Sequence, residues 1–246
     1  MNMNRQTNAY SIGWDVGGWN CDHNEKSRDA IVILNESLGV VGKPWRGNLR
    51  DTINKASTSR DWVSQLFDLC KNSLADINVE VTLAIDTPLG FSTEFQNLIT
   101  LRTPQSIIGL SDTNQYLYRK TERLLFERRK RPLSAIKDMI GSQATKGMHA
   151  LAKFAHHSRS CGVWSDNGRN LIAIEAYPAS CKESRLTKEL LNEIKLPATN
   201  EDIQDAAICA VVAHIFRTSR GELWPPSNEI PTNEGWIWLP KDALAT

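Results

Sequence analysis

The chain opens with three short apolar segments that have the character of β-strands. Residues 10–18 read YSIGWDVGG and end in a glycine turn, and the runs at 29–35 (DAIVILN) and 38–45 (LGVVGKPW) are rich in β-branched residues. Short apolar runs bounded by turn residues predict strands. We therefore expect three leading strands, preceded by a disordered polar tail over residues 1–9.

The next two segments differ in their period. Over residues 58–77, apolar side chains recur at helical spacing, and Ser57, Thr58 and Ser59 offer N-caps, which predicts an amphipathic helix. Residues 79–90 (VEVTLAIDTPLG) form a continuous apolar run that ends at a proline and a glycine. This pattern is typical of a buried strand.

The second half of the chain alternates between helical and strand patterns. Residues 91–112 show no clear period. We expect helices at 113–131 and 143–157, a polar loop at 158–170, a buried strand at 170–178 (NLIAIEAYP), one or two short helices at 179–195, a long apolar helix at 201–217 and a last strand at 235–240 (GWIWLP).

The order of these elements predicts the fold class. Three leading strands imply hairpins, and the strand–helix–strand crossover that follows implies parallel neighbours. Together they give an α/β fold, a mixed sheet with flanking helices, which is the element order of a ribonuclease-H-like core. The length of 246 residues suits one large domain. We expect a single domain over 10–246, with a helical insertion at roughly 91–160.

Composition narrows the class of protein. The net charge is +1, with 41% hydrophobic and 23% charged residues, so an anionic partner would have to be met by a local patch. The five cysteines form no CxxC pair and have no zinc spacing, which favours reduced thiols in a cytoplasmic protein. No apolar signal core and no run of 18 apolar residues is present, so no membrane partner is expected. The oligomeric state is left open.

Carboxylates stand at the ends of the predicted strands. Asp15 (GWDVGG), Asp86 (AIDTPLG) and Glu175 (AIEAYP) each directly follow an apolar run. Ligands of open α/β sheets gather at the carboxyl ends of strands, and a buried acid is costly unless it is paired or binds metal. Asp205, in the first turn of the 201–217 helix, adds a fourth acid, and Asp202 shares its face. The helix dipole is an alternative explanation for Asp202.

This set of side chains favours one kind of chemistry. Magnesium and manganese prefer carboxylate oxygen, and two such ions can activate water and stabilise the leaving oxygen of a phosphodiester. No His/Cys cluster offers a softer site. We therefore expect Mg²⁺ or Mn²⁺ bound by the catalytic acids Asp15, Asp86, Glu175 and Asp205, with nucleic acid as the partner.

A basic run follows at residues 119–131, RKTERLLFERRKR. Arg119, Lys120 and Arg123 are candidate contacts to substrate phosphate. A solvated helix face explains the same run equally well. Trp14 and Trp19 flank the Asp15 turn, where they could stack on bases, although core packing is the preferred interpretation.

Six motifs in order, GWDVGGW, AIDTPLG, YRKTER, IEAYP, DIQDAAICAVVA and GWIWLP, resemble the domain-of-unknown-function family 429. That family is regarded as predicted nucleases of ribonuclease-H-like fold. The resemblance spans residues 10–240 and implies that the family's metal acids map onto the four carboxylates named above. It also places Glu122, where the family usually has Asp, in a possible catalytic position.

Two alternatives remain open. DVGGW is similar to the first phosphate loop of actin-like kinases, so a small kinase or nucleotide phosphotransferase of that fold is one. The sequence shows neither a second DxG loop nor a glycine-rich adenosine motif. The other alternative is a non-catalytic module that binds a nucleotide or nucleic acid.

Overall fold

The computed structural model describes residues 8–74, 79–168, 170–196 and 200–244. Its centre is an eight-stranded sheet in the order β3-β2-β1-β4-β7-β6-β5, with β8 pairing alongside β7. The strands are β1 (Asn8–Asp15), β2 (Asp29–Leu34), β3 (Trp45–Gly47), β4 (Val79–Asp86), β5 (His157–Ser160), β6 (Val163–Ser165), β7 (Leu171–Ala176) and β8 (Ile237–Trp238).

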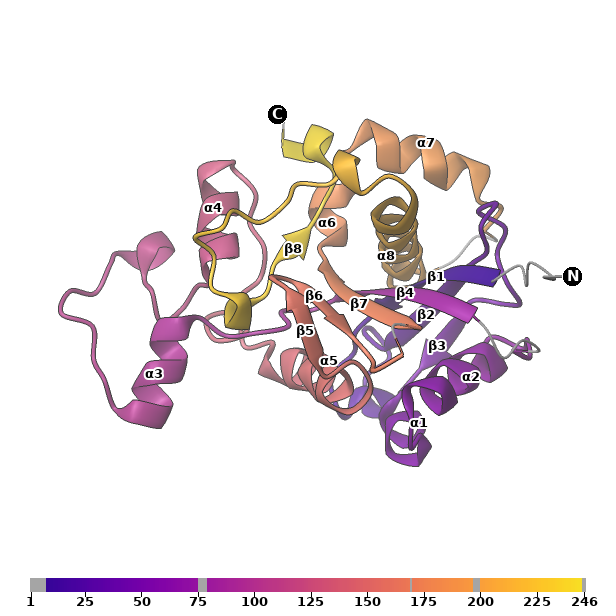
Figure 1. Cartoon of the computed structure of the whole chain (residues 1–246), viewed down its shortest axis with the longest axis horizontal. Helices are drawn as coiled ribbons and strands as arrows, with labels where there is room; N and C mark the ends of the chain where they lie inside the picture. The colour runs from indigo at the N-terminus through magenta and orange to yellow at the C-terminus, as the bar shows by residue number, and fades with distance from the viewer. Residues whose placement is uncertain (1–7, 75–78, 169, 197–199, 245–246) are drawn as a thin grey trace, which may run out of the picture.

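The sheet is mixed, as the element order predicts. The central strands β1, β4 and β7 run parallel, β8 is parallel to β7, and β2, β3, β6 and β5 join by antiparallel pairing. Helices flank this sheet (Figure 1). The α/β architecture expected of a ribonuclease-H-like core is therefore confirmed.

Helices cover both faces of the sheet (Figure 1). They are α1 (Arg50–Lys55), α2 (Ser59–Leu69), α3 (Thr93–Leu101), α4 (Lys120–Glu127), α5 (Gly141–Phe154), α6 (Pro178–Cys181), α7 (Arg185–Glu193) and α8 (Glu201–Thr218). One core cluster joins α8 to the sheet, and a second joins α1, α2 and α5 to the other face. The region predicted as a helical insertion contains α3, α4 and α5, but α5 packs on the sheet.

Side chains alternate between these two clusters along each strand. In β2, Ala30, Val32 and Leu34 belong to the α8 cluster, whereas Ile31 and Ile33 belong to the cluster of α2 and α5. This is the two-residue period of a strand buried on both faces. The same alternation decides which face each acid at a strand end presents.

Helix α8 packs directly against β1, and Gly13 makes this close contact possible. A Cβ atom at Gly13 would lie 1.8 Å from the carbonyl oxygen of Ala206 in α8. Three small residues of the helix, Ala206, Ala207 and Ala210, are fully buried in the same cluster. The absence of a side chain at Gly13 therefore allows the helix that carries Asp205 to pack directly against the strand that carries Asp15.

The structure corrects several predicted boundaries in the first half. Asn8 and Ala9 belong to β1, where they pair with β4, so they are not part of a tail; residues 1–7 lie outside the described residues. The strand predicted at 38–45 is displaced to β3, apart from one bridge between Leu34 and Val40. The helix predicted at 58–77 ends at Leu69, because Lys71 adopts a left-handed conformation (φ 59°); residues 75–78 lie outside the described residues.

Two further predictions change in the second half. The helix predicted at 113–131 is shorter and occupies only α4. The loop predicted at 158–170 instead contains the hairpin of β5 and β6, which turns at Gly162 (φ 68°). The residues of β5 are all exposed and polar, so no hydrophobic alternation marks this edge strand in the sequence.

Two observations bear on the expected cellular setting. All five cysteines are buried free thiols, as the cysteine spacing predicts. Among the described residues, no helix has the length and apolar character needed to cross a membrane.

Candidate active site

Asp15 and Asp86 lie side by side at the ends of two adjacent parallel strands. They are direct register partners of β1 and β4. Ala84, two residues before Asp86, packs in the α8 cluster, and Gly13, two residues before Asp15, contacts α8. By the two-residue period, both carboxylates therefore point to the α8 side of the sheet.

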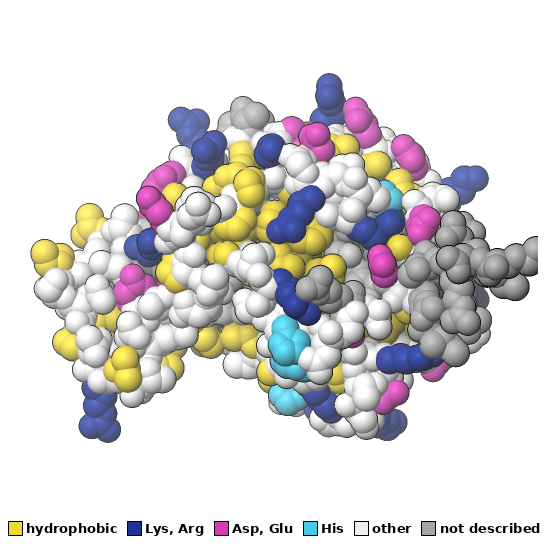
Figure 2. Space-filling model, viewed as in Figure 1, with side chains coloured by type: hydrophobic (Ala, Val, Ile, Leu, Met, Phe, Trp, Pro, Cys, Tyr) yellow, Lys and Arg dark blue, Asp and Glu magenta, His cyan; other side chains and the backbone are white. Residues whose placement is uncertain are grey.

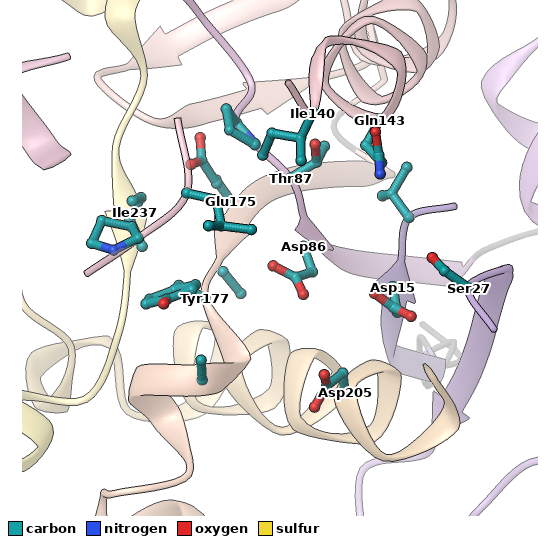
Figure 3. A pocket seen from close by; sticks show the side chains of 16 residues that line it. Asp15, Ser27, Asp86, Thr87, Ile140, Gln143, Glu175, Tyr177, Asp205 and Ile237 are labelled. Atoms are coloured by element: carbon teal, nitrogen blue, oxygen red, sulfur yellow. The ribbon is translucent and has the colours of Figure 1, made fainter. Parts of the chain in front are cut away.

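Asp205 reaches the same place from α8. The helix begins at Glu201, directly after the N-cap Asn200. Asp205 therefore lies in the second turn of the helix, whereas the sequence predicts it in the first. The helix dipole acts mainly within the first turn, so it does not account for an acid here. Asp15, Asp86 and Asp205 point toward a common space (Figure 3).

That space is a pocket of about 400 Å³ at the carboxyl ends of the central strands. Ser27, Thr87, Gln143 and Tyr177 supply its other polar side chains. Its remaining lining includes Val16, Pro88, Pro132, Leu133, Ile140, Ala176, Ala179 and Ile237, besides the four predicted acids. No Lys, Arg or His is among the described residues that line it.

Glu175 differs from the other three acids, and here the sequence prediction needs correction. Its register partner is Ile85, which packs in the cluster of α2 and α5, so Glu175 faces the side of the sheet opposite Asp86. It points away from the other three acids in Figure 3. Its oxygens accept hydrogen bonds from Arg119 (2.6 and 2.8 Å) and from the Leu89 backbone N–H (2.9 Å).

Arg119 is committed to this buried ion pair. Its side chain is 2% exposed, and it also donates to Glu122 (2.9 Å) and to the Glu234 backbone oxygen (3.0 Å). Arg119 is therefore an internal counterion in this structure, and its predicted contact with substrate phosphate stays a prediction. Glu122 is buried as the capping partner of Arg119, and burial raises its pKa to about 6, against the effect of Arg119. Neither side chain lines the pocket.

The remaining predicted site residues also lie outside the pocket. Asp202 accepts from Arg46 (2.5 Å) and from the Arg28 backbone N–H (3.1 Å), which ties the start of α8 to the sheet edge. The Lys120 ammonium donates to the Glu229 backbone oxygen (3.3 Å). Arg123 is half-buried on α4. None of them joins the three aspartates.

The three aspartates crowd negative charge into a half-buried space. Burial, with the negative charges of Asp86, Asp202 and Asp205 next, raises the pKa of Asp15 to about 9. Burial, with Asp205 and Glu175 next, raises the pKa of Asp86 to about 8. Burial also raises the pKa of Asp205. Burial is the largest cause of all three shifts, and neighbouring carboxylates add to each of them.

One cation partly compensates for this crowding. Lys182, just after α6, forms an ion pair with Asp205 (2.6 Å) and is itself partly exposed. It opposes the rise of the Asp205 pKa and, more weakly, that of Asp86. Sequence analysis missed Lys182, because nothing in the segment around it distinguishes it from any surface lysine.

Within the described residues, no three His, Cys, Asp or Glu side chains form a group that could hold a metal ion as they stand. Asp15, Asp86 and Asp205 therefore share a pocket without converging on a preformed metal site. The predicted Mg²⁺ or Mn²⁺ stays a prediction.

A second buried charge network supports the Asp15 turn. Lys146 of α5 and Asp29 of β2, both fully buried, form an ion pair. Asp29 also accepts from Trp14 Nε1 (3.0 Å) and from the backbone N–H groups of Gly17 (2.9 Å) and Leu49 (2.6 Å). The sequence offers one signal for this network, which is the position of Lys146 on the apolar face of the helix predicted at 143–157. Trp14 is fully buried and donates to Asp29, which agrees with core packing rather than stacking on bases.

Comparison of the chain with protein-family models, with curated proteins and with solved structures finds no match.

Proposed function

We propose that this protein is a divalent-metal-dependent nuclease that hydrolyses phosphodiester bonds in nucleic acid. The observation that carries the proposal is the placement of Asp15 and Asp86 as register partners, with Asp205 facing them across one pocket. The resemblance of the sequence motifs to the predicted nucleases of family 429 supports it.

The chemistry of the donors fits Mg²⁺ or Mn²⁺. The three side chains offer hard carboxylate oxygens, and the raised pKa values of Asp15 and Asp86 reflect burial together with repulsion between neighbouring carboxylates, which a bound cation would relieve. A pocket with no lining cation would repel a phosphodiester, so an anionic substrate needs bound metal here. When bound, such a metal supplies Lewis-acid stabilisation and lowers the pKa of water.

The chain's own residues divide into two roles in this proposal. Asp15, Asp86 and Asp205 would hold the metal after rotation of their side chains toward one another. Glu175 instead acts as a positioning residue: paired with Arg119, it accepts from the Leu89 N–H and so fixes the loop that leaves Asp86. Lys182 holds Asp205 in the absence of metal.

A cleavage assay tests the proposal directly. Labelled single-stranded, duplex, hybrid and branched nucleic acids are incubated with the protein and Mg²⁺ or Mn²⁺, with EDTA as the negative control. We expect cleavage of at least one substrate by the native protein and a loss of about 100-fold or more in Asp86→Asn, because removal of an essential catalytic group typically costs at least this much.

The matched control is Asp68→Asn, which removes one negative charge from an exposed position of α2. It should cleave like the native protein. Cleavage by both of these proteins but not by Asp86→Asn purified in the same way also excludes a contaminating nuclease. Binding of Mn²⁺ is measured in parallel by titration calorimetry. Mn²⁺ binding that is lost in Asp86→Asn, without any cleavage, would refute the nuclease and favour the non-catalytic binding module. Absence of Mn²⁺ binding would refute the metal site itself.

A further inference from the structure

A groove lined by three arginines lies on the α8 side of the sheet, away from the carboxylate pocket. Two adjoining hollows of about 180 and 300 Å³ share Ile172, Phe216 and Arg220. Arg217 lines the first hollow and Arg159 the second. In Figure 2, Lys and Arg side chains stand over a hydrophobic patch on the face where β5, β6 and β7 lie.

The groove is separate from the proposed catalytic site. It includes Thr82 near the start of β4, whereas Asp86 ends that strand. Four residues of strand correspond to about 13 Å. The groove also adjoins the last turn of α8, whereas Asp205 lies near its start. Nothing in the proposed nuclease chemistry uses these three arginines.

Arg220 is held in place without using its hydrogen-bond donors. Its guanidinium carbon lies 4.4 Å from the centre of the Phe216 ring and 4.7 Å from that of Trp238. Among the described residues, no carboxylate pairs with it and no acceptor binds its side chain. Partial burial lowers its pKa. A guanidinium stacked on aromatic rings with its donors free is suited to bind an anion.

Arg217 and Arg159 also line the groove with guanidinium groups that have no carboxylate partner among the described residues. Nε and Nη2 of Arg217 are buried, with no hydrogen-bond partner in the described part of the chain. Such unpaired donors are costly unless something else satisfies them. Arg159 donates to the Ser165 hydroxyl (2.5 Å) and to the Asp166 backbone oxygen (3.4 Å). No carboxylate among the described residues forms an ion pair with it. Glu80 is the one acid among the described residues that line the groove.

We infer that this groove binds the phosphate of a nucleotide, with Arg217 and Arg220 on the phosphate and the base over the apolar floor of Val163 and Ile172. Guanidinium forks match phosphate oxygens. The second hollow, with its apolar floor, is large enough for a flat ring system. The nucleotide is either free or part of a single strand, since both present the same phosphate and base. The inference is independent of the proposed nuclease activity, because it needs no metal.

Binding in EDTA tests this inference while metal chemistry is switched off. Fluorescence anisotropy follows a fluorescein-labelled oligothymidylate of about ten nucleotides, a typical site size for a single domain, and calorimetry follows ADP. We expect Arg217→Glu and Arg220→Glu each to weaken binding about 10-fold or more. If three phosphates are contacted, the oligonucleotide affinity should fall with salt at a logarithmic slope of about −2.

The matched control is Arg185→Glu, at a largely exposed position of α7, which changes the net charge equally. It should weaken binding by less than about 2-fold. Because Arg220 packs on two rings, Arg220→Lys is measured as well. It keeps the charge but loses the fork, so its affinity should lie between those of the native protein and Arg220→Glu, at a similar melting temperature.

Each outcome decides the matter. Binding of ADP alone supports a free nucleotide, and tighter binding of the oligonucleotide supports a strand. The inference is overturned if neither probe binds at about 1 mM, or if Arg185→Glu weakens binding as much as Arg220→Glu. Because binding is measured in EDTA and cleavage needs added metal, binding without cleavage, or cleavage in an Arg220→Glu variant that binds weakly, separates failure here from failure of the nuclease proposal.

Discussion

Replacing Asp86 by Asn should stabilise the metal-free protein at neutral pH. The folded state raises the pKa of Asp86 from 3.8 to about 8, chiefly through burial and then through Asp205 and Glu175. Between these two values the folded chain holds a proton that the unfolded chain has released. Unfolding therefore becomes more favourable as pH rises through this window. Asparagine carries no such proton, so the variant lacks this loss of stability.

The magnitude follows from the width of the window. One unit of pKa corresponds to about 1.4 kcal/mol, so the two units from about pH 5 to pH 7 correspond to about 3 kcal/mol. Asp86 is half-buried and titrates together with Asp15, and both features reduce this value. We expect the free energy of unfolding of Asp86→Asn, relative to the native protein, to increase by about 2 kcal/mol over that range.

Urea unfolding in EDTA at about pH 5 and pH 7 measures the difference. Asp68→Asn, at an exposed carboxylate, is the control and should differ from the native protein by less than about 0.5 kcal/mol at either pH. Added Mg²⁺ should then stabilise the native protein by about 3 kcal/mol at 100 times the dissociation constant. It should leave Asp86→Asn nearly unchanged.

Two results would refute this reasoning. Destabilisation by Asp86→Asn at pH 7 would show that the carboxylate makes structural contacts that stabilise the fold. A difference that stays constant from pH 5 to pH 7 would show that the pKa of Asp86 is ordinary, and the pocket would then lack the uncompensated charge that suggests a metal.

Three other substitutions should destabilise the fold, as measured by urea unfolding. Lys146→Met leaves the Asp29 carboxylate buried without its cation and should cost about 3–5 kcal/mol. Arg119→Met removes the partner of Glu175 and of one further buried acid and should cost about as much. Gly13→Ala would press a methyl group into the backbone of α8, so we expect a loss of about 3 kcal/mol.

Matched variants at exposed positions check these three expectations. Lys188→Met and Arg185→Met remove surface cations, and Gly221→Ala adds a methyl group where no atom lies within 4 Å. Each should change stability by less than about 0.5 kcal/mol. A loss below about 1 kcal/mol in Lys146→Met or Arg119→Met would mean that the ion pair is open to water. An equally mild Gly13→Ala would mean that α8 can move off β1.

The sequence by itself determines the central strands, the long final helix and the positions of two of the acids. Hydrophobic period and turn residues identify the central strands and the long final helix, because these elements are buried and local pattern follows burial. Asp15 and Asp86 each follow such a strand directly. Since parallel neighbours end at the same sheet edge, their meeting could be predicted without coordinates.

Only the tertiary structure decided which charges face the pocket and which are neutralised. Glu175 follows an apolar run just as Asp86 does, but pairing with Ile85 turns it to the opposite face of the sheet. A one-residue difference in register reverses a side chain, and local pattern does not encode register. Arg119 lies 56 residues from Glu175, and Lys146 lies 117 residues from Asp29. Such buried ion pairs depend on long-range packing, which local sequence does not show. The basic run at 119–131 suggests a phosphate-binding surface, but its first residue, Arg119, is a buried counterion of Glu175.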